Sequence, residues 1–121
     1  MKKILIVEDQ QDVQTLLKVA LTQSDRILLH AENAMRGLAL AREERPDLVL
    51  LDIMMPGSMD GMGLLRELKA DARTAKAKII VLSAKAQQQD KDKAVEAGAD
   101  SYITKPFRLS HLKECIHQAL L

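Results

Sequence analysis

Carboxylate side chains follow directly after two short apolar runs of the sequence. Glu8 and Asp9 follow the run Ile4–Val7, and Asp52 ends the run that begins at Leu48. An unbroken apolar run is typical of a parallel strand that is buried on both faces. In open parallel sheets, ligands bind beyond the carboxyl ends of the strands. We therefore expect the three acids at one edge of a sheet, where they could bind a ligand together.

Two other polar residues stand at the ends of later predicted strands. Ser83 follows the run 78–82, and Lys105 follows the run 101–104. Three carboxylates at one edge repel one another and raise one another's pKa values, and a hard divalent cation would relieve this. Oxygen ligands without a histidine or a thiolate favour Mg²⁺, with Mn²⁺ as the alternative.

This set of groups predicts phosphoryl transfer. An anion at Asp52 would meet the metal ion on one side and the Lys105 ammonium on the other, with the Ser83 hydroxyl as a neutral donor. Catalysis of phosphoryl transfer consists mainly of such positioning and charge neutralisation. Asp52 would be the nucleophile and would form an acyl phosphate.

The segments between the apolar runs have a helical period, which determines how these groups are positioned. Strands are predicted at 4–7, 27–29, 48–51, 78–82 and 101–104, and helices are predicted to begin near Gln10, Asn33, Asp60, Gln87 and Leu109. This alternation predicts an α/β fold, (βα)5, with a doubly wound five-stranded parallel sheet and helices on both faces. The residues 1–121 should form one domain, as their number suggests.

Several local features are expected within these elements. Asn33 should cap a helix that buries Met35, Leu38 and Ala41, and that helix should end at Arg45, held extended by the proline that follows. The helix near 87–97 has few apolar residues and should pack loosely. Gly98 should end it in a left-handed conformation.

Composition excludes several classes of function. The net charge is +1 and aromatic residues make up 2% of the chain, which argues against binding to nucleic acids or to anionic membranes. Cys115 is the single cysteine, so the chain has no internal disulfide, as expected of a cytoplasmic protein. The apolar runs are too short to span a membrane.

Five motifs in a fixed order resemble the receiver domain of bacterial two-component response regulators. They are Glu8-Asp9, Asp52-Ile53-Met54-Met55-Pro56, Met59-Asp60-Gly61, Ser83-Ala84 and Tyr102-Ile103-Thr104-Lys105-Pro106-Phe107. The resemblance covers the whole chain and implies the flavodoxin-like strand order 2-1-3-4-5, which is known for this family. In one respect the chain departs from the family pattern: two residues, Gly57 and Ser58, separate Pro56 from Met59, where the family usually has one.

The resemblance also assigns roles to individual residues. The Mg²⁺ ligands would be Asp9, Asp52, the backbone carbonyl of Met54 and, through water, Glu8. Asp52 would accept the phosphoryl group, and the residues that respond to it would be Ser83, Ala84, Lys105 and Tyr102. The peptide bond before Pro106 would be cis.

The function implied by the resemblance is a signalling switch and not an enzyme. A sensor histidine kinase or a phosphotransfer protein would phosphorylate Asp52, and the surface of the fourth helix, fifth strand and last helix would change for a downstream protein or effector domain. The unphosphorylated chain is expected to be a monomer in the cytoplasm, without direct contact to nucleic acid or membrane.

Three alternatives differ in chemistry. A phosphatase of the haloacid dehalogenase type needs a second acid two residues after its nucleophile, where this chain has Met54. A flavin or nucleotide module needs a phosphate-binding loop after the first strand, where Glu8 and Asp9 would repel the phosphate. A receiver-like interaction domain that does not depend on phosphorylation would have lost an acid or the lysine, and all are present.

Overall fold

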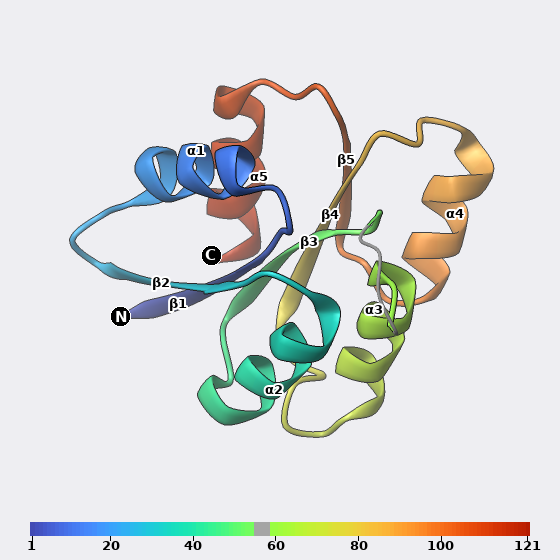
Figure 1. The fold of residues 1–121 in the computed structure, drawn as a ribbon, viewed down its shortest axis with the longest axis horizontal. Helices are drawn as coiled ribbons and strands as arrows, with labels where there is room; N and C mark the ends of the chain where they lie inside the picture. Colours follow the sequence, from blue (N-terminus) through green and yellow to red (C-terminus); the bar gives the residue numbers. More distant parts are fainter. Residues whose placement is uncertain (55–58) are drawn as a thin grey trace.

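In the described part of the chain, five parallel strands form one sheet, and five helices cover its two faces (Figure 1). The computed structural model describes residues 1–54 and 59–121, so the expectation about Gly57 and Ser58 lies outside the described residues. In chain order the elements are β1 (Lys2–Val7), α1 (Gln11–Leu21), β2 (Arg26–Ala31), α2 (Ala34–Glu44), β3 (Leu48–Asp52), α3 (Gly61–Ala70), β4 (Lys78–Ser83), α4 (Gln88–Glu96), β5 (Ser101–Thr104) and α5 (Leu109–Ala119). The strand order is β2-β1-β3-β4-β5, which confirms the predicted fold class and order.

The register of the strands brings their carboxyl ends to one edge. Val7 pairs with Leu51, Asp52 with Leu82, and Ser83 with Thr104. The residues that follow β1, β3, β4 and β5 therefore leave the sheet on the same side. The alignment follows from the apolar runs, because each buried run must lie between the same two layers of helices.

The core has two halves, one on each face of the sheet. Helices α2, α3 and α4 cover one face, and α1 and α5 cover the other (Figure 1). Alternate residues of one strand enter different halves: on β1, Leu5 and Val7 face α2 and α3, whereas Ile4 and Ile6 face α1 and α5. Burial on both faces explains why β1, β3 and β4 each contain an unbroken run of apolar residues.

Helix α2 corrects one of the local expectations. Asn33 caps it as predicted, since its Oδ1 accepts a hydrogen bond of 2.8 Å from the amide of Arg36. Met35, however, is 54% exposed, and the buried face is formed by Ala34, Gly37, Leu38 and Ala41. A Cβ added at Gly37 would lie 3.0 Å from the Val7 side chain, so this helix packs closely on β1 through its small residues.

The end of α2 also differs from the expectation. Arg45 has φ 47° and ψ 64°, which is left-handed and not extended. This conformation turns the chain sharply out of the helix, so that Asp47 reaches β1, where its amide donates to the Lys3 carbonyl. The tight connection thus outweighs the extended preference that Pro46 imposes on the residue before it.

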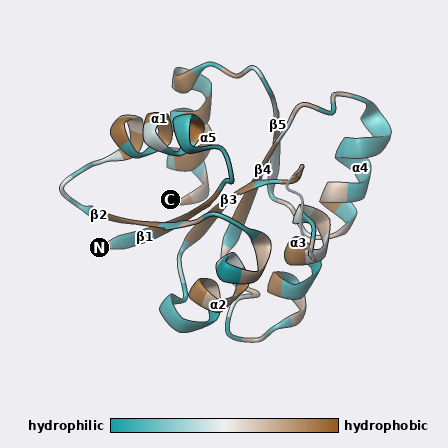
Figure 2. Cartoon of the chain, in the orientation of Figure 1, coloured by the Kyte–Doolittle hydropathy of each residue, from teal (hydrophilic) through white to brown (hydrophobic). Residues whose placement is uncertain are grey.

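Helix α4 has the polar character that the sequence predicts. Ala94 is its one buried residue, and the helix is mostly hydrophilic in Figure 2. Gly98 follows it with φ 114°, in the left-handed region as predicted. Among the residues described, no helix is both long and apolar enough to cross a membrane.

Candidate functional site

Three carboxylates and one ammonium group meet at the carboxyl edge of the sheet. The Lys105 Nζ lies 3.1 Å from Glu8 Oε1 and 3.3 Å from Asp52 Oδ2. Glu8, Asp9 and Asp52 each place a carboxylate oxygen within 4.8 Å of the others. Residues from β3 and from the segments that follow β1 and β5 are thus brought together, although Glu8 and Lys105 are 97 positions apart in the chain.

Burial of two of the three acids shifts pKa values within this cluster. Glu8 is 1% and Asp52 5% exposed, whereas Asp9 is exposed. Burial of the Glu8 carboxyl, with the interaction with Asp52 adding to it, raises the pKa of Glu8 from 4.5 to about 7, although Lys105 opposes the shift. Burial disfavours the charged form of Lys105, but Asp52 and Glu8 outweigh this and raise its pKa. One lysine therefore neutralises only part of the negative charge.

The donor set fits a hard divalent cation. The three carboxylates supply oxygen ligands only, close enough for one ion to contact them all, and the cluster carries unbalanced negative charge. Mg²⁺ is usually held by one or two carboxylates with water and phosphate oxygens completing its shell. Met54 is held beside the cluster because its amide donates to Asp52 Oδ1 at 3.0 Å.

Two residues that the sequence did not point to support the turn that carries the acids. Gln14 Nε2 from α1 donates to the backbone carbonyl of Glu8 at 2.6 Å, and His30 Nε2 from β2 lies 3.3 Å from the same oxygen. His30 is partly buried. Its place near the end of a strand beside β1 is the signal that could have identified it.

The expected switch residues lie along the same edge. Ser83 is fully buried, and its Oγ accepts a hydrogen bond of 3.1 Å from the amide of Lys85, whereas Ala84 is exposed. The hydroxyl of Tyr102 donates to the carbonyl of Lys85 at 2.8 Å. Ser83 and Tyr102 are thus connected through one residue of the loop after β4.

The segment after β5 is also fixed to this edge. The amide of Lys105 donates to the carbonyl of Ser83 at 2.8 Å, and the bond between Lys105 and Pro106 is cis. Lys105 is therefore anchored through its backbone to β4 while its side chain reaches across to Asp52 on β3.

The five-stranded parallel sheet and the cluster of acids and lysine at its carboxyl edge are typical of one class of signalling domain. Comparison with known proteins identifies that class. Residues 4–117 match the response regulator receiver domain family, so the chain belongs to that family. The sequence-based identification is therefore confirmed.

Individual relatives differ in how much of their length this chain matches. The phosphate regulon transcriptional regulatory protein PhoB of Pseudomonas aeruginosa is 43% identical over 88% of this chain but over 46% of its own length. The chain spans about half the length of the first such regulators that it matches. Protein PilH of the same species is 39% identical over 99% of this chain and 98% of its own.

A solved structure has the same fold. It is the receiver domain of the sensor histidine kinase PA1611 from Pseudomonas aeruginosa, described with a magnesium ion coordinated in the active site cleft. It is 28% identical, covers 98% of this chain and 97% of its own, and has a TM-score of 0.87.

Proposed function

We propose that this chain is a phosphorylation-controlled switch of a two-component system, in which Asp52 accepts a phosphoryl group with the help of Mg²⁺. The observation that carries the proposal is the position of the Lys105 ammonium between the Glu8 and Asp52 carboxylates, in contact with both. A lysine in this place can turn from a carboxylate to a phosphoryl oxygen without leaving the site.

The donor would be a phosphohistidine of a sensor kinase or of a phosphotransfer protein. A carboxylate oxygen of Asp52 attacks the phosphorus, the P–N bond breaks, and the released imidazole nitrogen takes up a proton. Glu8, Asp9, Asp52 and the carbonyl of Met54 would hold Mg²⁺, which when bound neutralises charge on the carboxylates and the phosphoryl oxygens.

The response would begin at Ser83 and Lys105. The phosphoryl group adds up to about two negative charges and three strong acceptor oxygens, and both side chains can donate to it. Ser83 Oγ now accepts from the amide of Lys85, and Tyr102 donates to the carbonyl of that residue. A change at Ser83 therefore reaches Tyr102 directly through the loop after β4.

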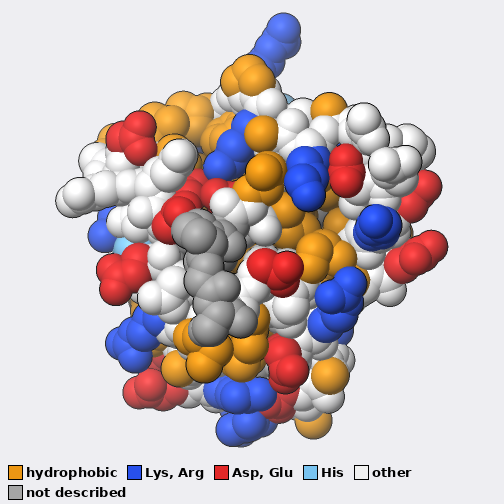
Figure 3. Space-filling model, turned by 45° about the vertical axis from the view of Figure 1, so that its right-hand side comes forward, with side chains coloured by type: hydrophobic (Ala, Val, Ile, Leu, Met, Phe, Trp, Pro, Cys, Tyr) orange, Lys and Arg blue, Asp and Glu red, His pale blue; other side chains and the backbone are white. Residues whose placement is uncertain are grey.

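The surface of α4, β5 and α5 would carry the output. Helix α4 buries one residue, Ala94, so it is easier to shift than its neighbours. Apolar side chains lie among acidic and basic ones on the face shown in Figure 3, a mixture that suits contact with a protein partner. We infer an effector domain or a separate protein as that partner, and a monomeric receiver domain over residues 1–121 when it is not phosphorylated.

The test is the intact mass of the protein after incubation with acetyl phosphate, with and without Mg²⁺. The wild type should gain one phosphoryl group only when Mg²⁺ is present, and Asp52→Asn should gain none. Asp12→Asn is the matched control, because Asp12 is an exposed acid near the site, and it should react like the wild type.

Two outcomes would contradict the proposal. A phosphoryl adduct on Asp52→Asn would place the nucleophile elsewhere. A wild type that gains no adduct from acetyl phosphate or from a phosphorylated phosphotransfer protein would favour a receiver-like interaction domain that works without phosphorylation.

A further inference from the structure

Gly61, the first residue of α3, lies directly against the backbone at the end of β3. A Cβ added at Gly61 would lie 2.4 Å from the Cα of Ile53, and 2.7 and 2.8 Å from the carbonyl oxygens of Ile53 and Asp52. Non-bonded carbon atoms are best separated by about 3.5–4.0 Å, so a side chain does not fit here. All three neighbouring atoms belong to the backbone, so no rotation of a side chain could make room.

The two sides of this contact differ in how firmly they are held. Helix α3 is anchored in the core by fully buried leucines, Leu64, Leu65 and Leu68. Asp52 is still part of the sheet, where it pairs with Leu82. Ile53 and Met54 lie beyond the end of the strand, and Met54 is 51% exposed. A side chain at position 61 would therefore displace Ile53 and Met54 before it displaced α3 or β3.

We propose that Gly61 is a positioning residue for the Mg²⁺ site, because its bare backbone lets α3 support the segment from Asp52 to Met54. The inference rests on the proposed function, in which Asp52 and the carbonyl of Met54 hold the ion. A side chain at position 61 would push Ile53 and Met54 away from α3 and would move the Met54 carbonyl. Loss of a group that supports a metal ligand commonly weakens metal binding by about 10–100-fold.

Gly63 provides a matched control within the same helix. A Cβ added there would lie 3.1 Å from Asp60 Oδ1 and 3.2 Å from Met59 Cγ, which are both side-chain atoms. Gly63→Ala thus adds the same methyl group as Gly61→Ala, but small side-chain shifts accommodate it. Leu68→Ala is a second control, because it removes a fully buried side chain near the other end of α3 and lowers stability away from the metal ligands.

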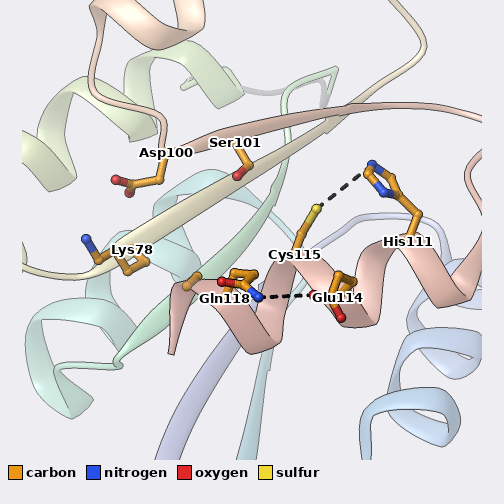
Figure 4. Close-up of a pocket in the computed structure, with 8 residues that line it drawn as sticks. Lys78, Asp100, Ser101, His111, Glu114, Cys115 and Gln118 are labelled. Atoms are coloured by element: carbon orange, nitrogen blue, oxygen red, sulfur yellow. Dashed lines mark hydrogen bonds between the residues drawn. The ribbon is translucent and has the colours of Figure 1, made fainter. Parts of the chain in front are cut away.

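Residues at the opposite end of the sheet show whether the effect of Gly61→Ala stays local. Ser101 and Cys115 line a hollow of about 320 Å³ (Figure 4). Ser101 begins β5, whereas Asp52 ends β3, and the strands are parallel, so the hollow lies away from the acids. In NMR spectra of ¹⁵N-labelled protein, the amide signals of Ser101 and Cys115 should be the same in Gly61→Ala and the wild type, whereas the amide signal of Met54 should shift.

The test is a titration of the ¹⁵N-labelled proteins with Mg²⁺, followed by NMR. The wild type, Gly63→Ala and Leu68→Ala should have similar dissociation constants for Mg²⁺, and that of Gly61→Ala should be about tenfold higher or more. Urea unfolding of the same proteins separates an effect on metal binding from an effect on stability.

Hydrogen exchange in the wild type is a second measurement, which needs no variant at position 61. If the segment that carries the ligands rests on α3, Mg²⁺ binding and the first turn of α3 stabilise each other. Mg²⁺ should therefore slow exchange of the Leu64 amide, which donates to the Asp60 carbonyl, more than exchange of the Asp71 amide at the end of the helix.

Equal Mg²⁺ dissociation constants of Gly61→Ala and the wild type would overturn the proposal, as would an unchanged Met54 amide signal. If Leu68→Ala weakened Mg²⁺ binding as much as Gly61→Ala, the effect would be one of stability and the proposal would also fail. Should Gly61→Ala not fold, equal slowing of exchange at Leu64 and Asp71 would decide against it. A wild type that does not bind Mg²⁺ would overturn the proposed function, and this role of Gly61 with it.

Discussion

The ammonium group of Lys105 contacts two carboxylates, and its single positive charge cannot balance both. Its single ammonium faces Glu8 and Asp52, both nearly excluded from solvent. Burying a carboxylate is costly unless its charge is balanced. The free energy of unfolding should therefore depend on what else neutralises this edge: a proton, a metal ion or, as we propose, a change of partner by Lys105.

Protonation of Glu8 gives a prediction about pH. The pKa of Glu8 is about 7 in the folded protein and near 4.5 when the chain is unfolded. Between these values the folded state holds a proton that the unfolded state has lost, so the metal-free protein should become less stable as pH rises through this range. The loss should level off once the pH is above the pKa of Glu8 in the folded protein.

Urea unfolding in EDTA at pH 5 and pH 7.5 measures this effect. Glu8→Gln cannot ionise, so its stability should fall by less than that of the wild type over the same interval. Asp12→Asn is the control, since Asp12 is an exposed acid outside the cluster, and it should keep the pH dependence of the wild type. Parallel curves for Glu8→Gln and the wild type would contradict the prediction.

At the scale of single residues, the sequence indicated which side chains would come together at the site. It did not indicate which other side chains hydrogen-bond to the backbone that carries them. Glu8, Asp9, Asp52, Ser83 and Lys105 could be placed at one edge because each ends or follows a predicted strand. Gln14 could not, because its contact with the Glu8 carbonyl depends on the rotation of α1. The position of His30 near a strand end pointed to this edge, but its contact with the same carbonyl also depends on the pairing of β2 with β1. A sequence pattern shows whether a segment is a helix or a strand. It does not give the orientation of that element precisely enough to predict a single hydrogen bond.

Among the elements, α2 shows that the hydrophobicity of a residue does not by itself predict whether that residue is buried. Met35 was expected on the buried face of α2 with Leu38 and Ala41, yet Met35 is exposed, and Gly37 lies against Val7 of β1. A helix can approach a sheet closely only through small side chains, and the resulting close packing outweighs the burial of one methionine. The extent of α2, in contrast, was predictable from its cap at Asn33 and from the proline after its end.

The caps of α2 and α4 give a prediction about helix stability. Asn33 Oδ1 accepts the amide of Arg36, so Asn33→Ala should lower the free energy of unfolding by about 1 kcal/mol. Gln87 occupies the same position in α4 without a side-chain cap bond, so Gln87→Ala should change stability by less than about 0.5 kcal/mol. Urea unfolding measures both, and an equal loss in the two variants would show that the cap bond contributes nothing.

For the molecule as a whole, the alternation of strands and helices predicted the layers but not the strand order. The order 2-1-3-4-5 came from the family resemblance, because several doubly wound orders satisfy the same alternation. The two halves of the core follow from this order, and the sheet separates them.

This separation predicts additive effects of mutation. Leu64 in α3 and Leu112 in α5 are fully buried on opposite faces, so Leu64→Ala and Leu112→Ala should each cost about 2–5 kcal/mol. The double variant should lose the sum, because the two sites share no contacts. Val19→Ala is the control, since Val19 is 75% exposed. Thermal or urea unfolding measures all four, and a double variant that loses much less than the sum would show that the halves are coupled.

The place of β1 inside the sheet has a consequence for synthesis on the ribosome. β1 is made before β2 and β3, yet it pairs with both of them. Until Leu48–Asp52 has been translated, one edge of β1 stays unpaired, and the side chains of Ile4–Val7, all buried in the finished fold, stay accessible to other chains. The nascent chain is therefore most prone to aggregation before β3 emerges, and slower translation between β2 and β3 should lower the yield of folded protein.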